Sequence, residues 1–397
     1  MASMSAAEHE LPFPVEEYRD RARRVRAEMA RRGVAVLYVM SPPNINYLTG
    51  FESIWYPPRA PVGVALAVDS EELVFFDYER HLHLVSQTAH YDEAVWFTYE
   101  TALDAVADGL AARGWTKGTV GIERWTVSPG APLVEAVAER LRTRGATVVD
   151  GDWIVDRVRA VKSPAELVCV RKAAEIVDAA FLEIQDYIRP GRTELQIAAR
   201  LNAIMADHGG EEAAIRTMVS AGPLVWCRTH GASGHRPVER GDVMFVDACG
   251  VYRRYHVDLC RTFSLGQDHP KARAVLEYTR DSVLAVQKAV KRGDPLDVAQ
   301  RAAEEYVFAR YGPENVWWVG GYALGVALPP SWVGHTYLSN DAWEPFTWEP
   351  GYVTNYENIL FDRDEGFTAS YMETLLMTAD GIETLSKLPR DLIVVEF

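Results

Sequence analysis

One stretch, residues 241–263, constrains the fold of this chain more than any other. It reads GDVMFVDACGVYRRYHVDLCRTF, and each of its two strand-like runs carries one aspartate, Asp247 and Asp258. Gly250 permits a turn between the runs, so we expect an antiparallel hairpin. A buried carboxylate is costly unless a positive charge neutralises it. The pair therefore predicts a metal ion, a cationic ligand or basic partners at this hairpin.

Length and charge limit the classes of function. At 397 residues the chain exceeds the usual size of one hydrophobic core, which favours two domains. Its formal net charge of -15 argues against nucleic acid or an anionic membrane as the main partner. Apolar runs are too short to cross a bilayer, and the N-terminus lacks a signal-peptide pattern. Because the four cysteines show no close pairing, we expect a reducing, cytoplasmic location.

The first predicted domain, residues 1–158, is of the α/β class. Residues 15–32 have the pattern of an amphipathic, arginine-rich helix, and residues 42–51 that of a turn-rich segment. The runs 61–68 and 72–77 are expected to pair as a hairpin. Helical and strand-like segments then alternate, which is typical of an α/β unit.

The second predicted domain, residues 159–397, is of the α+β class. Ser163 is expected to cap a long helix over residues 164–188, with Pro164 at the first helical position and Glu166 in a capping box. Strand-like segments follow, interrupted by helices near 269–291 and 295–311. This pattern favours antiparallel strands.

Two further acids lie in strand-like segments near the C-terminus. Glu357 stands in VTNYENILF and Glu373 in TASYMETLLM. Each could lie on the solvent face of an edge strand, because glutamate is rarely buried unless paired. Four such acids in one domain instead favour a shared site. Without a counter-charge they would take up protons, so a metal or a cationic substrate is expected there.

The order of these motifs resembles the pita-bread family, which includes methionine aminopeptidase, aminopeptidase P, prolidase, creatinase and ectoine hydrolase. The resemblance rests on the basic segment before Pro164, the two aspartates, GGYALG at 320–325, and the two glutamates. The preceding domain looks like the creatinase-type N-terminal domain. The fold implied is an α/β N-terminal domain plus an α+β pita-bread catalytic domain.

The metal-dependent members of this family hold a pair of divalent cations with two Asp, one His and two Glu. The resemblance implies ligands for Mn, Fe, Zn or Co at these positions: Asp247, Asp258, Glu357 and Glu373. Tyr322 stands where the histidine is expected, and a phenol with a pKa of about 10 is a poor ligand. Residues 321–332 look more like ectoine hydrolase, whose branch works without metal. A bound divalent cation and a metal-free site for a cationic substrate both stay open.

The resemblance also implies a catalytic histidine. His230 precedes the Gly-Asp pair at the spacing at which creatinase, ectoine hydrolase and aminopeptidase P carry their active-site histidine. Imidazole can accept and donate a proton near neutral pH. Glu357 and Glu373 would hold and activate water or the cationic group of the substrate. The alternative for His230 is an ordinary surface-loop histidine.

Aromatic and basic side chains are candidates for substrate binding. Tyr322 and Trp332 could contact a cationic substrate through cation–π interactions. Strand alternation places His256 on the face of the second aspartate. In creatinase-like dimers an aromatic and an arginine from the partner reach the active site, and Trp55 and Arg59 occupy similar positions in the chain. A surface loop is the alternative for these two residues.

Together these features predict a homodimeric hydrolase that cleaves a C–N bond of a small amino-acid-derived, amidine or cyclic substrate. A metal-dependent Xaa-Pro dipeptidase or aminopeptidase is the nearest alternative. A lyase and a non-catalytic binding module on the same fold are further alternatives.

Overall fold

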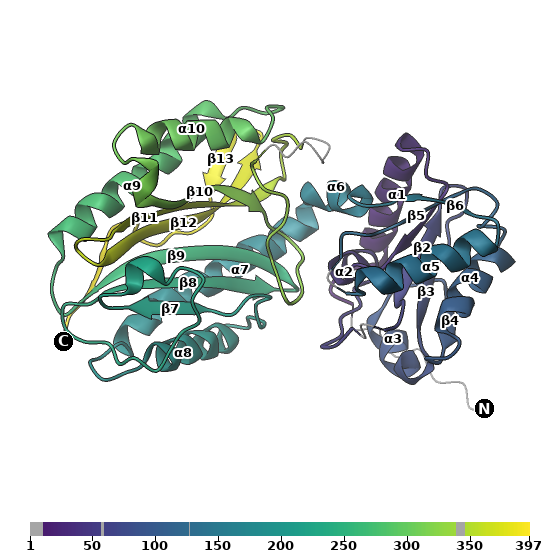
Figure 1. Ribbon diagram of the computed structural model, residues 1–397, viewed down its shortest axis with the longest axis horizontal. Helices are drawn as coiled ribbons and strands as arrows, with labels where there is room; N and C mark the ends of the chain where they lie inside the picture. Colours follow the sequence, from purple (N-terminus) through teal and green to yellow (C-terminus); the bar gives the residue numbers. More distant parts are fainter. Residues whose placement is uncertain (1–10, 57–58, 127, 339–345) are drawn as a thin grey trace. The chain divides into compact units, whose positions relative to one another are not determined.

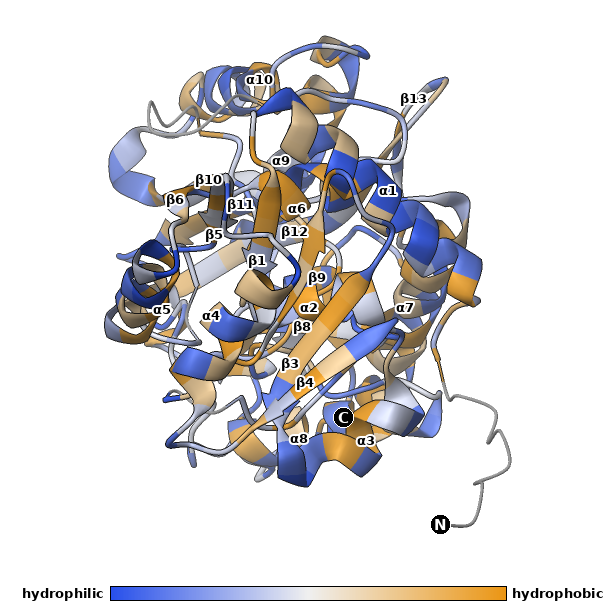
Figure 2. Ribbon diagram, turned by 90° about the vertical axis from the view of Figure 1, so that its right-hand side faces the viewer, coloured by the Kyte–Doolittle hydropathy of each residue, from blue (hydrophilic) through white to orange (hydrophobic). Residues whose placement is uncertain are grey.

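The computed structural model describes residues 11–56, 59–126, 128–338 and 346–397. The chain divides into two compact units, Met1–Arg159 and Ala160–Phe397 (Figure 1). Hydrophobic residues concentrate on strands such as β3 and β12, whereas α1 carries many hydrophilic ones (Figure 2). None of the described helices combines the length and the hydropathy of a bilayer-crossing segment.

The N-terminal unit is built on one mixed sheet with the strand order β4-β3-β2-β1-β5-β6. The strands are β1 (Val36–Val39), β2 (Gly63–Ala67), β3 (Leu73–Tyr78), β4 (Glu93–Phe97), β5 (Thr119–Ile122) and β6 (Thr147–Asp150). The helices are α1 (Val15–Arg31), α2 (Pro42–Thr49), α3 (Leu82–Thr88), α4 (Ala102–Ala112), α5 (Ala131–Thr143) and α6 (Ile154–Ala160). The predicted hairpin is the antiparallel pair β2 and β3.

One local prediction in this unit is wrong. The segment expected to be turn-rich, 42–51, contains the helix α2. Proline is favoured in the first helical turn, where the missing N–H has no intrahelical partner, and Pro42 occupies that turn. Gly50 ends the helix in the left-handed region, with φ of 79°. The Pro and Gly residues therefore delimit a helix here.

The C-terminal unit is built on a second sheet with the order β10-β11-β12-β9-β8-β7. The strands are β7 (Met218–Ala221), β8 (Val243–Tyr252), β9 (Tyr255–Leu265), β10 (Val316–Ala323), β11 (Val353–Asp362), β12 (Phe367–Thr378), β13 (Gly381–Thr384) and β14 (Ile393–Val395). The helices are α7 (Pro164–Glu183), α8 (Glu194–Asp207), α9 (Pro270–Ala289) and α10 (Asp297–Phe308). The strands β7 to β12 pair antiparallel along this order, which confirms the predicted fold class.

The helices cover one face of this sheet, which we call the outer face. Helix α7 packs on β8 and β9, and α9 packs on β11 and β12 (Figure 1). The predicted capping box at Ser163 and Glu166 starts α7. Tyr356 of β11 donates a hydrogen bond of 2.7 Å to Ser282 of α9, which identifies the side of β11 that faces the helices. The opposite side of the same strands is the inner face.

The hairpin of β8 and β9 turns later than predicted. Gly250 lies inside β8, and a Cβ there would approach the Ala173 carbonyl oxygen of α7 to 2.1 Å, so close helix packing requires the glycine. The turn lies at Arg253 and Arg254, whose φ values are 50° and 65°. Glu211 accepts the backbone N–H of both arginines at 2.8 Å, which stabilises a conformation that non-glycine residues rarely adopt.

Candidate active site

Three acids meet on the inner face because the strand register places them in two adjacent rows. Paired residues of neighbouring antiparallel strands share a face. The first row, from β10 to β7, consists of Gly320, Glu357, Met372, Cys260, Asp247 and Met218. The second row, from β10 to β8, consists of Tyr322, Asn355, Thr374, Asp258 and Cys249. We call Asp247, Asp258 and Glu357 the acid cluster.

The acid cluster is buried without a basic partner. Asp258 is fully buried, while Asp247 and Glu357 are 9% and 8% exposed. Burial raises the pKa of Asp247, and the charges of Asp258 and Glu357 raise it further. Burial and then Asp258 raise the pKa of Glu357 to about 8. Among the described residues, no Lys, Arg or His forms an ion pair with these three acids, so the cluster favours uptake of protons or of a cationic group.

An amide and a phenol connect the acid cluster. The Asn355 side-chain N–H group donates to Glu357 Oε1 at 2.8 Å and also to Asp258 Oδ2. The same nitrogen lies 2.8 Å from the Tyr322 hydroxyl oxygen. Tyr322 in turn donates to Asp258 Oδ2 at 3.0 Å and accepts from Trp332 Nε1 at 3.2 Å. The two predicted aromatic residues are therefore part of the same polar network as the acids.

The structure does not bring Glu373 to the acid cluster, contrary to its expected role as ligand and catalyst. Its neighbour Met372 pairs with Glu357, and alternation places Glu373 on the outer face. There Glu373 forms a fully buried ion pair with Arg261 at 3.1 Å. It also accepts hydrogen bonds from the Tyr371 hydroxyl and the Ser386 N–H. Its counter-charge comes from within the protein, which is typical of a structural acid.

His256 is fully buried, and both of its ring nitrogens are bonded to the backbone. Nε2 accepts the Ala214 N–H at 3.0 Å, and Nδ1 lies 2.9 Å from the Arg254 carbonyl oxygen, so the proton resides on Nδ1. Burial lowers the pKa of His256 to about 3, and the charge of Arg254 adds to this effect. The ring packs near Trp332, with centroids 6.0 Å apart. His256 is therefore a neutral support for Trp332, not a free group that could bind substrate through its nitrogens.

His230 lies in the loop after β7 and is exposed. Its ring meets Trp317 of β10 edge-on, with centroids 4.6 Å apart. Because β7 and β10 stand at opposite ends of the strand order, this contact brings the two ends of the sheet together. The φ of His230 is 66°, a strained value for a residue other than glycine. Within the described residues, no hydrogen bond joins His230 to the acid cluster.

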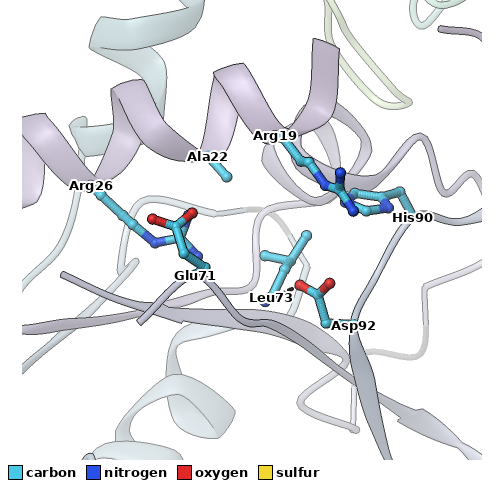
Figure 3. Close-up of a pocket in the computed structure, with 7 residues that line it drawn as sticks. All are labelled: Arg19, Ala22, Arg26, Glu71, Leu73, His90 and Asp92. Atoms are coloured by element: carbon cyan, nitrogen blue, oxygen red, sulfur yellow. Dashed lines mark hydrogen bonds between the residues drawn. The ribbon is translucent and has the colours of Figure 1, made fainter. Parts of the chain in front are cut away.

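Two other predicted residues, Trp55 and Arg59, belong to the N-terminal unit. Trp55 is 49% exposed, and Arg59 is also exposed. A cavity of 320 Å³ lies elsewhere in this unit (Figure 3). It is lined by side chains of both charges and two apolar residues: Arg19, Ala22, Arg26, Glu71, Leu73, His90 and Asp92. None of these residues was a predicted site residue.

Sequence reasoning missed Asn355 and Met372. Asn355 stands two residues before Glu357 in the same strand, so alternation alone could have placed both on one face. Met372 carries no such signal, because an apolar residue in an apolar strand is ordinarily core. Only the pairing of β11 with β12 shows that it faces the acids.

The residues present do not fit a pair of divalent cations. The resemblance implies five ligands, of which three carboxylates lie on the inner face. Tyr322 stands where the histidine ligand is expected, and Met372 rather than Glu373 faces the acids on β12. Burial and the neighbouring acids raise the pKa of Tyr322, so it stays a neutral phenol. A thioether suits soft ions rather than a hard cation such as Mn²⁺. Among the described residues, no group of three or more His, Cys, Asp or Glu has the spacing of a metal site.

Comparison with known proteins supports this architecture. Residues 168–379 match metallopeptidase family M24, and residues 21–161 match the creatinase/prolidase N-terminal domain. An ectoine hydrolase of Halomonas elongata is 28% identical, with 97% of this chain and 98% of the relative covered. An Xaa-Pro dipeptidase of Pyrococcus furiosus is 22% identical over 92% of this chain and 97% of the relative.

Solved structures share the fold. An X-Pro aminopeptidase from Thermotoga maritima superposes with a TM-score of 0.80 at 22% identity, covering 94% of this chain and 99% of that structure. The sequence match to the family spans more than half of the chain, and the predicted resemblance is confirmed. This chain belongs to metallopeptidase family M24, with a creatinase/prolidase N-terminal domain.

Proposed function

We propose that this protein is a hydrolase that cleaves a C–N bond of a small amino-acid-derived or amidine-containing substrate. The observation that carries the proposal is the acid cluster, three buried carboxyl groups without a basic partner in the described protein. The similarity to an ectoine hydrolase over nearly the whole chain supports the same substrate class.

An ammonium or amidinium group would neutralise the acid cluster. A cation within hydrogen-bonding distance favours the ionised form of each carboxyl and offsets the cost of burying its charge. Amidinium N–H groups can also donate to two carboxylates at once. Binding would therefore orient the substrate by its charged end and place its scissile C–N bond at a fixed position.

His230 is proposed as the group that moves the proton. As water adds to the carbon of the C–N bond, the imidazole accepts one proton from the water. It then returns that proton to the departing nitrogen as the C–N bond breaks, so the step is balanced. The exposure of His230 and its strained backbone support this role.

An Xaa-Pro dipeptidase or aminopeptidase is the second candidate. The M24 match, the relative in Pyrococcus furiosus and the Thermotoga maritima structure favour it. The donor set disfavours it, because Tyr322 and Met372 stand at two of the inner-face positions and provide no strong ligand for a divalent cation.

A homodimer completes the proposal. Trp55 and Arg59 are exposed on the N-terminal unit, and an Arg side chain suits a substrate carboxylate. We propose that both act at the site of a partner subunit. Light scattering of the purified chain, together with kinetics of Arg59→Ala, tests this part. A monomer with full turnover would contradict it.

A substrate panel tests the reaction. The full-length protein is incubated with ectoine, other cyclic amidines, guanidines and Xaa-Pro dipeptides, with Mn²⁺ or with a chelator, and products are followed by mass spectrometry. We expect amidine hydrolysis that the chelator does not reduce and that His230→Asn lowers at least about 100-fold. Xaa-Pro cleavage that requires Mn²⁺ would overturn the proposal in favour of the second candidate.

A further inference from the structure

We infer that three inner-face side chains, Tyr322, Asn355 and Met372, exclude divalent metal from the acid cluster and adapt it to an organic cation with several N–H donors. The preference for an organic cation rests on the proposed function. The exclusion of divalent metal does not, and it can be tested without a substrate.

Met372 occupies the β12 position that faces the acids. It is buried and lies between Glu357 of β11 and Cys260 of β9 in the first row. Directly paired residues have Cβ atoms about 4.5–5.5 Å apart, so a carboxylate at this position would reach the cluster. The thioether instead offers an uncharged, soft sulfur. The acid that follows it in the sequence, Glu373, is paired with Arg261 on the other face.

The Tyr322 hydroxyl group is already engaged within the protein. Its oxygen accepts from Trp332 and lies 2.8 Å from the Asn355 amide nitrogen, and its one proton is donated to Asp258. A neutral phenol held in this way is a poor ligand for a divalent cation. An imidazole at the same position would carry a neutral nitrogen ligand toward the acids.

The Asn355 amide lies between two of the acids, Asp258 and Glu357. Its amide nitrogen donates to both Asp258 and Glu357, so the protein itself supplies N–H donors to these carboxyl groups. The buried acceptor Asn355 Oδ1 has no hydrogen-bond partner among the described residues, and Asp247 and Asp258 lie close enough to hydrogen-bond to each other when one of them is protonated. Buried acceptors of this kind favour a ligand with N–H donors, such as an amidinium, over a quaternary ammonium.

The test rebuilds the missing donors. The double variant Tyr322→His/Met372→Glu and its uncharged control Tyr322→Phe/Met372→Gln are purified as full chains and titrated with Mn²⁺ and Co²⁺ by calorimetry, followed by elemental analysis after dialysis. We expect the double variant to bind Mn²⁺ at least about 100-fold more tightly than the unaltered protein, since it gains an imidazole and a carboxylate ligand. The control is expected to show no gain.

The outcomes separate the inference from the proposed function. Stoichiometric Mn²⁺ in the unaltered protein, or no gain in the folded double variant, would overturn the inference whatever the substrate panel shows. If the double variant does not fold, Tyr322→His alone decides, because it adds one ligand without a fourth buried acid. It must then bind Mn²⁺ more tightly than Tyr322→Phe, and equal binding overturns the inference.

The preference for an organic cation has its own readout. Thermal midpoints of the unaltered protein are compared with acetamidinium and with tetramethylammonium, at equal concentration and ionic strength. Stabilisation by acetamidinium alone supports the preference for N–H donors, and loss of that shift in Asp258→Asn assigns it to the acid cluster. Equal stabilisation by both cations would overturn this preference.

Discussion

Glu357 and Glu373 are buried glutamates on opposite faces of one sheet, and among the described residues a basic side chain pairs with Glu373 but not with Glu357. Glu373 contacts Arg261, the Tyr371 hydroxyl and the Ser386 N–H, so its charge is matched inside the protein. Glu357 has the Asn355 amide and the Tyr322 hydroxyl as neutral neighbours, and the charge nearest to it is that of another acid, Asp258. Burial raises the pKa of both. A counter-charge within the fold, rather than burial, therefore distinguishes Glu373 from Glu357, the acid that we propose binds the cationic group of a substrate.

The largest effect is expected from Glu373→Ala. The free energy of unfolding should fall by about 3–5 kcal/mol, because Arg261 would remain buried without its partner. Urea denaturation at fixed protein concentration measures this. The double replacement Arg261→Leu/Glu373→Leu is the control and should lose less than the single variant. If Glu373→Ala kept full stability but lost turnover, Glu373 would be a functional acid rather than a structural one, which would contradict the assignment.

Glu357→Gln should lower turnover without lowering stability, whereas Glu373→Ala is expected to lower stability. Turnover is expected to fall at least about 100-fold, because a neutral amide cannot attract the cationic group of the substrate. The unfolding free energy should stay equal or rise, since a buried carboxyl without a cation is removed. Steady-state kinetics and urea denaturation of the same preparation measure both quantities. Glu373→Gln is the matched control, and its kcat should stay within a few-fold of the unaltered value.

Glu123 of the N-terminal unit tests whether a raised pKa alone marks a site. Burial and the nearby Asp156 raise its pKa to about 8, although Met40 N–H, Ser41 N–H and Asn44 donate to its oxygens. Between about pH 4.5 and 8 the folded state holds a proton that the unfolded state has released, so this contribution to stability is full below pH 4.5 and falls as pH rises.

The measurement is the unfolding free energy of the unaltered protein and of Glu123→Gln across pH 5–9. We expect a shallower decline with pH in the variant and unchanged kcat at each pH. A parallel decline would show that Glu123 does not titrate in this range, and a loss of kcat would extend the functional acids beyond the inner face.

The smallest effect concerns the cysteines of the inner face. Burial and the neighbouring acids raise the pKa of the Cys249 and Cys260 thiols, whereas Cys227 is exposed. In native protein a thiol reagent should modify Cys227 rapidly and the other two slowly. Peptide mapping after a short pulse checks this, with Cys227→Ser as control. Rapid labelling of Cys249 would show that the inner face is open to water.

Sequence patterns predicted most elements because each had a local cause. The hairpin of β2 and β3 follows from alternation, and α7 begins at a capping box that the sequence spells out. The two aspartates and Glu357 were predicted to share a site, and the register brings them to one face.

Side-chain direction in β12 could not be predicted in the same way. This strand is buried on both faces, so its sequence shows no alternation to reveal whether Met372 or Glu373 faces the acids. That choice depends on pairing with β11, which is a long-range property. His256 illustrates the same limit, because its nitrogens are occupied by backbone groups of Ala214 and Arg254 that alternation cannot foresee.

The hydrogen bonds from Arg253 and Arg254 to Glu211, which stabilise the turn between β8 and β9, have a consequence for how the protein folds. The Arg253–Arg254 turn lacks the residues that favour positive φ, and the acid that stabilises it lies 42 positions before Arg253. We therefore expect the hairpin that carries both aspartates to gain little from local nucleation. Contact with a distant segment costs loop entropy before it stabilises the turn, so we expect the acid cluster to assemble late in folding, after α8 and the chain that follows it are in position.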